Sequence, residues 1–264
     1  MFYILYHKVF KHDTSKTWVM FVHGAGGSSS IWFKQIREYR KYFNIVLLDL
    51  RGHGQSKKSF LEKKEYTFEM VSSDIIEVMN YLKVEKAHFV GISLGTILIR
   101  NLADKYPERI QSMVLGGAVI RITPKLNILL KMANALKHYV PYMWLYRFLA
   151  WILMPRNTHK QSRNLFVQEA KKVQQKEFLR WFKLTSSVAS ILLKYGERDT
   201  NIPTLYVMGA QDYMFLLPVQ EIAKSFKLNE LEVIENCGHV CNVDQPKLFN
   251  ELSIQFIVRQ QIYT

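Results

Sequence analysis

The feature of the sequence that most limits its fold is a regular alternation of short apolar runs and helical patterns over the first 117 residues. The runs that predict strands are Trp18–Val22, Asn44–Leu48, Ala87–Val90 and Ser112–Leu115. The windows that predict helices lie between them, near Ile31–Tyr42, Phe68–Leu82 and Leu94–Tyr106. Such alternation is typical of βαβ units, in which crossover helices cover both faces of a parallel sheet. The predicted fold class is therefore α/β.

The alternation stops near Gly116 and resumes near residue 200. The pattern between is almost continuously helical, and an insertion of about 80 residues without strands is too long for a loop. It predicts a helical cap over residues 121–199, with an α/β core made of residues 1–120 and 200–264. The second part of the core is predicted to contain strands Thr204–Met208 and Leu231–Ile234 and helices near Val219–Phe226 and Pro246–Ile262.

Composition places the chain among ordinary globular proteins. Its 264 residues are 48% hydrophobic and 22% charged, enough for one large core. The two cysteines, Cys237 and Cys241, form no disulfide framework, so a reducing, cytoplasmic compartment is expected. The stretch Met1–Lys8 lacks the pattern of a signal peptide and predicts a first strand. The most apolar stretch, Tyr142–Met154, is shorter than the ~20 residues that span a bilayer.

The strongest chemical signal is the motif Gly91-Ile92-Ser93-Leu94-Gly95, which lies between a predicted strand and a predicted helix. A strand that turns sharply into a helix exposes the serine hydroxyl at the apex, and small flanking residues leave room for the turn. The helix N-terminus also favours developing negative charge. The alternative is a glycine-rich turn with a helix-capping serine. The strand before and the helix after favour Ser93 as a nucleophile.

A serine nucleophile needs a base, and the base needs a carboxylate to orient it. His239 lies in a glycine-flanked loop after the last predicted strand, and Asp212 lies in the loop after the strand before it. Both loops leave carboxyl ends of strands, at the edge where Ser93 also lies. His23 and His53 compete as bases, because they also lie in glycine-flanked turns. The chain order Ser93, Asp212, His239 is one that such triads use.

Two backbone N–H groups are predicted to hold the oxyanion that a serine attack creates. One belongs to Leu94, directly after the nucleophile. The other belongs to Ala25, where the flanking Gly24 and Gly26 let the backbone approach the substrate and are themselves predicted to bind it. The alternative is a phosphate-binding loop, but the third glycine of a dinucleotide fingerprint is missing at the required offset.

These segments together resemble the α/β-hydrolase superfamily. The resemblance rests on His23-Gly24, the stretch Asp49-Leu50-Arg51-Gly52-His53-Gly54-Gln55-Ser56, the Ser93 motif, Gly209 with Asp212, and Gly238-His239. The subgroup it resembles comprises small capped esterases, C–C hydrolases and perhydrolase-like enzymes. The resemblance implies an eight-stranded, mostly parallel sheet flanked by helices, a helical cap after the middle strands, and no metal or organic cofactor. It also implies a structural role for the turn 51–56.

The activity that follows from the motifs and the resemblance is hydrolysis of carboxylic esters with an apolar acyl or aromatic group, through an acyl-enzyme on Ser93. A thioesterase or a C–C bond hydrolase would use the same triad, and a perhydrolase would add peroxide chemistry. A slow-turnover ligand receptor derived from a hydrolase also stays open. A dehalogenase or an epoxide hydrolase would carry a nucleophilic Asp at this position, so Ser93 argues against both.

The positive charge is concentrated in the predicted cap. The whole chain has a net charge of +14, and residues 121–199 contribute +11 of it, from fifteen Lys or Arg and four Asp or Glu. Basic and aromatic residues together on helices are typical of peripheral contact with an anionic membrane. They are also typical of a lid that lines an apolar pocket and has a solvated outer face, which is the interpretation we favour. Trp144 and Trp151 are then predicted to contact the substrate.

Two other partner classes are not expected. The cap has the charge for nucleic acid, but the sequence contains no recognised nucleic-acid-binding module. Cys237 and Cys241 bracket His239, yet no further ligands at matching spacing accompany them, so a metal site is not predicted. The expected partner is a small-molecule ester.

Overall fold

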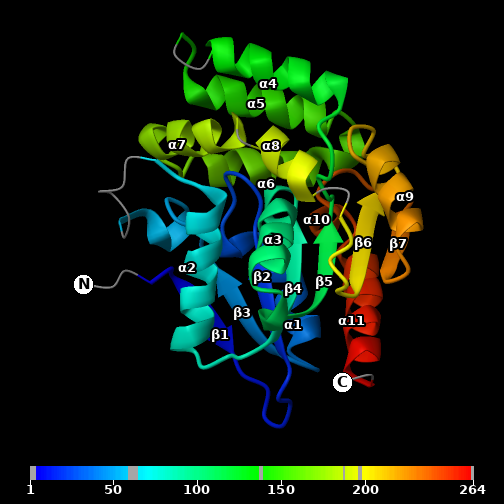
Figure 1. Ribbon diagram of the computed structural model, residues 1–264. Coiled ribbons are helices and arrows are strands. Elements are labelled where there is room, and N and C mark those ends of the chain that lie inside the picture. The colour runs from blue at the N-terminus through cyan, green and yellow to red at the C-terminus, as the bar shows by residue number, and fades with distance from the viewer. Residues whose placement is uncertain (1–3, 59–64, 137–138, 187, 196–197, 263–264) are drawn as a thin grey trace.

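The computed structural model describes residues 4–58, 65–136, 139–186, 188–195 and 198–262 (Figure 1). Its strands form one seven-stranded sheet in the order β1-β3-β2-β4-β5-β6-β7. β1 pairs antiparallel with β3, and every other pairing is parallel. The strands are β1 (His7–Phe10), β2 (Trp18–Val22), β3 (Asn44–Leu48), β4 (Ala87–Ile92), β5 (Ile110–Gly116), β6 (Thr204–Gly209) and β7 (Asn229–Ile234).

Helices cover both faces of the sheet and the edge at which its parallel strands end. The core helices are α1 (Phe33–Tyr39), α2 (Phe68–Tyr81), α3 (Leu94–Lys105), α9 (Leu216–Ser225), α10 (Cys241–Asp244) and α11 (Pro246–Ile262). The helices between β5 and β6 are α4 (Pro124–Leu136), α5 (Tyr142–Leu153), α6 (Lys160–Ala170), α7 (Gln175–Ser186) and α8 (Val188–Tyr195). Short 3-10 helices are η1 (Ser29–Trp32), η2 (Gly54–Lys58), η3 (Pro107–Arg109) and η4 (Asn157–His159).

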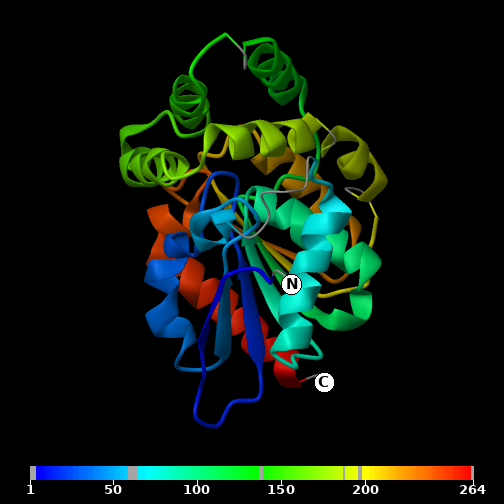
Figure 2. The same ribbon diagram turned by 90° about the vertical axis from the view of Figure 1, so that its left-hand side faces the viewer.

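The central strands are buried on both faces because successive side chains point to opposite sides of the sheet. In β2, Val19 and Phe21 pack in a cluster with α1 and α11, whereas Met20 and Val22 pack in the cluster of α2 and α3. Figure 2 shows these two helical layers on either side of the sheet. The near-continuous apolar runs of the sequence therefore predicted the buried parallel strands, and the α/β fold is confirmed.

The expected number of strands needs a correction, since the described residues contain seven and not eight. Within Met1–Lys8 only the last two residues belong to a strand, β1, and Met1–Tyr3 lie outside the described residues. After β1 the chain passes through one loop to β2, the third strand of the sheet. The antiparallel edge is therefore a single short strand.

The helices α4–α8 lie above the carboxyl ends of the parallel strands (Figure 1). No strand occurs in the described residues of this insertion, as the sequence pattern predicted. Nor is any helix in the described part of the chain both long and apolar enough to cross a membrane.

Buried polar contacts hold this helical cap on the core. Glu177 of α7 accepts a hydrogen bond from the Tyr66 hydroxyl and pairs with Arg180 at 2.6 Å. Trp181 donates its indole N–H to the carbonyl of Arg51 at 2.9 Å. Arg51 in turn makes a bidentate ion pair with Asp74 of α2, with 2.7 Å from Nε to Oδ2 and 2.5 Å from Nη2 to Oδ1. The turn after β3 thus connects the cap to a core helix, in line with the structural role expected of it.

We predict that Asp74→Ala lowers the free energy of unfolding by about 3 kcal/mol, because it leaves a buried guanidinium without its carboxylate. Chemical denaturation followed by circular dichroism measures the change. Glu230→Ala is the matched control, since the Arg259–Glu230 pair lies on the surface, and such pairs contribute roughly 0–1 kcal/mol. Equal losses in the two variants would contradict the role assigned to the buried pair.

Candidate active site

Ser93 occupies a strained turn between β4 and α3. Its φ and ψ are 55° and −121°, a conformation that non-glycine residues rarely adopt. Gly95 makes the turn possible, because a Cβ there would collide with the carbonyl oxygen of Val22. A Cβ on Gly91 would likewise collide with Ile99. The small residues of the motif are thus explained by close packing of α3 against two strands.

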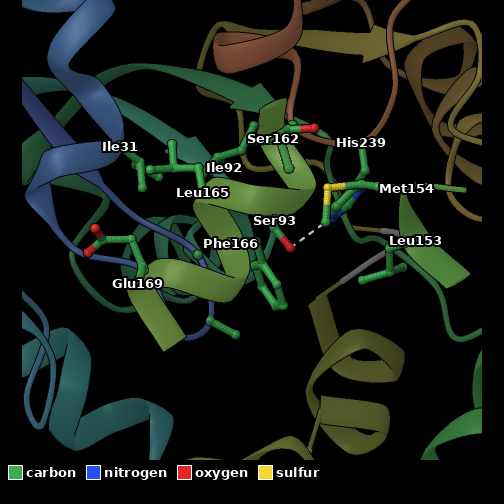
Figure 3. Close-up of a pocket in the computed structure, with 14 residues that line it drawn as sticks. Ile31, Ile92, Ser93, Leu153, Met154, Ser162, Leu165, Phe166, Glu169 and His239 are labelled. Carbon is green, nitrogen blue, oxygen red and sulfur yellow. Dashed lines mark hydrogen bonds between the residues drawn. The ribbon is translucent and has the colours of Figure 1, made fainter. Parts of the chain in front are cut away.

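The structure brings the three predicted residues into one hydrogen-bonded series. His239 Nε2 lies 2.9 Å from Ser93 Oγ (Figure 3). On the other side of the ring, His239 Nδ1 lies 2.8 Å from Asp212 Oδ2. Asp212 and His239 are each 2% exposed, so the carboxylate–imidazole pair is shielded from water. The ring of Phe215 packs against His239 with 4.9 Å between centroids. The geometry is that of a nucleophile, a base and an orienting acid.

His23 and His53, the competing candidates for the base, are buried, and both rings accept hydrogen bonds from backbone N–H groups. The Leu50 N–H donates to His23 Nε2 at 3.0 Å, and the Gly26 N–H donates to His53 Nε2 at 3.1 Å. Burial lowers the pKa of both rings, to about 3 for His53, where the neighbouring His23 adds to the effect. Both rings are therefore neutral supports of the glycine-rich loop, and neither reaches Ser93.

The predicted oxyanion donors lie on both sides of Ser93. Leu94 is the first residue of α3, so its N–H has no acceptor within the helix. Ala25 lines the cavity beside Ser93. The next two N–H groups of its loop are already used, by His53 for Gly26 and by the Gly24 carbonyl for Gly27. Gly24 lies so close to Ser93 that a Cβ on it would be 3.2 Å from the Ser93 Cβ.

Two chambers meet at Ser93 and His239. The larger has a volume of about 180 Å³, and its walls are almost wholly apolar. The helices α4, α5 and α7 contribute half of the residues that line it, namely Leu126, Leu129, Leu130, Tyr146, Leu149, Leu153, Phe178, Trp181 and Phe182. The smaller chamber, of about 50 Å³, lies toward α6 and includes Ser162 and Glu169 (Figure 3).

Trp144 and Trp151 do not line either chamber, so their predicted contact with substrate is corrected. Their side chains are 69% and 60% exposed on the outer face of α5. Residues seven positions apart lie on the same face of a helix, and here that face is the solvent side. Tyr146 and Leu149 of the same helix face inward. A Cβ on Gly26 would be 2.8 Å from the Tyr146 hydroxyl, so this predicted binding residue is covered by the cap.

Two cap residues without a role predicted from sequence contact the loops of the site. His159 Nε2 lies 2.9 Å from Gln211 Oε1, and its ring packs so closely on Gly238 that a Cβ there would be 2.7 Å from it. His159 thus touches the neighbours of both Asp212 and His239. A single histidine within a basic helical segment carries no sequence signal for such a position.

Glu169 of α6 is the second. It is buried and accepts a 2.6 Å hydrogen bond from Ser28 Oγ, at the end of the glycine-rich loop. Burial by itself would raise the pKa of Glu169, but hydrogen bonds from Lys172 and Ser28 outweigh it and hold the pKa below its ordinary value. An ionised carboxylate therefore lies in the wall of the smaller chamber.

The two cysteines are buried beside the site. Burial is the main cause that raises the pKa of both thiols, Cys237 and Cys241, so the reactive thiolate is disfavoured. Within the described residues, no group of three or more His, Cys, Asp and Glu side chains is placed to hold a metal ion.

Comparison with known families matches residues 17–246 to the alpha/beta hydrolase fold. The chain belongs to the α/β-hydrolase family. This confirms the family expected from the motifs around residues 23, 93, 212 and 239, and the match spans both parts of the core and the helical insertion between them.

Relatives and solved structures span several activities. A pimeloyl-[acyl-carrier protein] methyl ester esterase of Wigglesworthia glossinidia brevipalpis is 25% identical, over 90% of this chain and 93% of its own length. A carboxylesterase structure from Nitrososphaera gargenis has a TM-score of 0.77 at 16% identity, covering 98% and 96% of the two chains. The meta-cleavage product hydrolase CumD of Pseudomonas fluorescens IP01 has a TM-score of 0.76 at 21% identity, covering 97% and 94%. The two structural likenesses show the shared fold.

We predict that His53 makes the protein acid-sensitive. The ordinary pKa of 6.5 applies to the unfolded chain, whereas the folded value is about 3. Between these values the unfolded chain binds a proton that the folded chain does not. The contribution of His53 to the free energy of unfolding is therefore fully present above pH 6.5. It falls by up to about 1.4 kcal/mol per pH unit as the pH decreases from 6.5 toward 3.

His53→Gln keeps an acceptor for the Gly26 N–H and carries no titrating ring, so its unfolding free energy should fall less steeply below pH 6.5. Urea denaturation of both proteins over a pH series measures the two slopes. Above neutral pH the two stabilities should be similar, which controls for packing. Identical slopes in the acid range would show that His53 is not a source of the effect.

Proposed function

We propose that the protein hydrolyses carboxylic esters whose acyl or aromatic group is apolar. The observation that carries the proposal is the hydrogen-bonded series Ser93–His239–Asp212 at the point where an apolar chamber opens. Several of its relatives are hydrolases or esterases by name, which supports an enzyme. The methyl ester esterase among them supports ester cleavage in particular.

In the proposed first step, Ser93 Oγ attacks the ester carbonyl carbon while His239 Nε2 takes the hydroxyl proton. The N–H groups of Ala25 and Leu94 donate to the oxyanion. When the tetrahedral intermediate collapses, the C–O bond to the alcohol breaks and His239 gives its proton to the leaving oxygen. Asp212 orients the imidazole and stabilises its positive charge, and an acyl-enzyme remains on Ser93.

In the proposed second step, water takes the place of the alcohol. His239 removes a proton from the water as its oxygen attacks the acyl carbon, and then returns the proton to Ser93 Oγ as the ester bond to the enzyme breaks. The products are a carboxylic acid and the free enzyme. Neither step calls for a metal or an organic cofactor.

The volumes and linings of the two chambers support the assignment of the acyl group. The 180 Å³ chamber is lined by aliphatic and aromatic side chains and suits an alkyl chain or a ring. The smaller chamber is bordered by Ser162 and Glu169 and has room for a compact leaving alcohol. We assign the larger chamber to the acyl group and the smaller to the alcohol.

We predict that a fluorophosphonate probe forms one covalent adduct with the wild-type protein and none with Ser93→Ala. Intact-mass spectrometry measures labelling. The same substitution should lower kcat for an aryl ester at least about a thousandfold. Ser162→Ala is the matched control, because this serine also lines the site but lies outside the triad. An adduct that persists in Ser93→Ala would assign the nucleophile elsewhere, and an unlabelled, folded wild type would favour a ligand receptor.

We predict that kcat/KM for p-nitrophenyl esters rises from acetate to medium-chain esters by about fourfold per methylene, as each is buried in the larger chamber. Leu149→Trp fills that chamber and should shift the preference toward acetate. Leu193→Trp makes the same change on a side chain that is 85% exposed, and should leave the series unaltered. A sharp preference of the wild type for acetate would contradict the assignment of this chamber.

A further inference from the structure

The outer faces of α4 and α5 carry a cluster of exposed apolar side chains. Seven of the seventeen large apolar side chains exposed in the described residues lie within the short span 128–151. They are Ile128, Met132, Leu136, Tyr139, Trp144, Phe148 and Trp151. We call these seven residues the hairpin patch. Exposed apolar side chains concentrated on two consecutive helices are typical of a site of contact with an apolar partner.

The helical repeat explains how the patch forms. Ile128, Met132 and Leu136 recur every four residues on α4, and Trp144, Phe148 and Trp151 recur every three or four on α5. Each helix is also apolar on its other side, where Leu129 and Leu149 line the larger chamber. Both figures show α4 and α5 as the outermost layer of the molecule (Figures 1 and 2). The hairpin therefore separates the catalytic chamber from the outside by one layer of helices.

The charged residues of α4 and α5 have one sign. The segment 110–168 contains eight Lys or Arg and no Asp or Glu. Three of these cations lie exposed on the two helices of the patch, Lys125 and Lys131 on α4 and Arg147 on α5. Arg147 lies three residues after Trp144 and four before Trp151, so the cation lies on the same face of α5 as the two exposed tryptophans. A surface that combines aromatic and aliphatic groups with basic residues matches the interface of an anionic bilayer.

We propose that the α4–α5 hairpin docks on an anionic phospholipid surface, with the hairpin patch inserted among the headgroups and the adjacent Lys and Arg paired with lipid phosphates. Trp144 and Trp151 enter the interfacial layer, where amphipathic rings are favoured. Docking places the thin wall of the larger chamber against the lipid. The ester substrate then comes from that surface, a consequence that rests on the proposed function.

Charge favours lipid over a second copy of the chain. A two-fold dimer pairs the same surface of both protomers. A dimer through the hairpin patch would therefore bring Lys125, Lys131 and Arg147 of one protomer close to the same cations of the other. An anionic lipid surface instead supplies opposite charge at high density.

The test is flotation of the full chain with two kinds of vesicle, one of phosphatidylcholine alone and one of phosphatidylcholine and phosphatidylglycerol in equal parts. We expect binding to the mixed vesicles, much weaker binding to phosphatidylcholine, and release by high salt. The double variant Trp144→Gln/Trp151→Gln should bind the mixed vesicles with an affinity at least about tenfold lower, because the two indole rings are no longer buried in the lipid. Lys131→Glu/Arg147→Glu should lose at least about tenfold on mixed vesicles and little on phosphatidylcholine.

Tyr81→Gln is the matched control, since Tyr81 is a 68% exposed aromatic on α2, away from the hairpin. It should bind as the wild type does. Unfolding midpoints equal to that of the wild type show that the hairpin variants are folded. Failure of the wild type to float with mixed vesicles, or flotation of the hairpin variants equal to the wild type, would overturn the proposal. A dimer in sedimentation that the tryptophan variant abolishes, without vesicle binding, would assign the patch to a second copy.

Hydrolysis of a short, water-soluble aryl ester separates this proposal from the proposed function. Vesicle binding without hydrolysis of any ester would support the docking surface and contradict the proposed esterase activity. Hydrolysis without vesicle binding would do the reverse. The hairpin variants should hydrolyse the water-soluble ester at the wild-type rate, because the residues they change lie outside both chambers.

Discussion

The close approach of α3 to the ends of β2 and β4 is the constraint on which the rest of the site depends. It holds Ser93 at a φ of 55°, and it is possible because Gly95 has no side chain to collide with the backbone of Val22. The same packing turns the N-terminus of α3 toward the space above the sheet. Since parallel strands share one direction, the loops after β6 and β7 reach that space too, and they bring Asp212 and His239 within hydrogen-bond distance. A local strain is thus maintained by the rigid sheet around it.

The cap is held on this core by polar groups that would be costly to separate. Its contacts fall on the loops of the site: Glu169 on Ser28, His159 on Gln211, and Trp181 on the turn after β3. Each is buried or partly buried, so its loss would leave an unpaired polar atom in a dry environment. These contacts also explain the acids of a strongly basic segment. Glu169 and Glu177 are buried at the junction with the core, and the exposed charged residues of α4 and α5 are all Lys or Arg.

The cap has apolar residues on two sides, and the two sides have different roles. The inner face, with residues such as Leu149, closes the chamber above Ser93. The outer face of the same helices has no described element packed over it, and there Trp144 and Trp151 are more than half exposed. The apolar composition of Tyr142–Met154 therefore reflects both the lining of a chamber and an exposed surface. A pocket alone does not account for it.

The sequence by itself determined the α/β fold, the helical insertion and the residues that meet at the strand ends, because short apolar runs, helical periodicity and glycine spacings are local properties of the chain. It could not determine that the antiparallel edge is the single strand β1, since pairing at an edge depends on where the chain lies relative to β3. Nor could it decide which apolar face of α5 lines the chamber, because helical periodicity defines faces and not their direction. Only the tertiary structure turned Trp144 outward and brought His159 onto Gly238, since both positions depend on how the cap packs against the core.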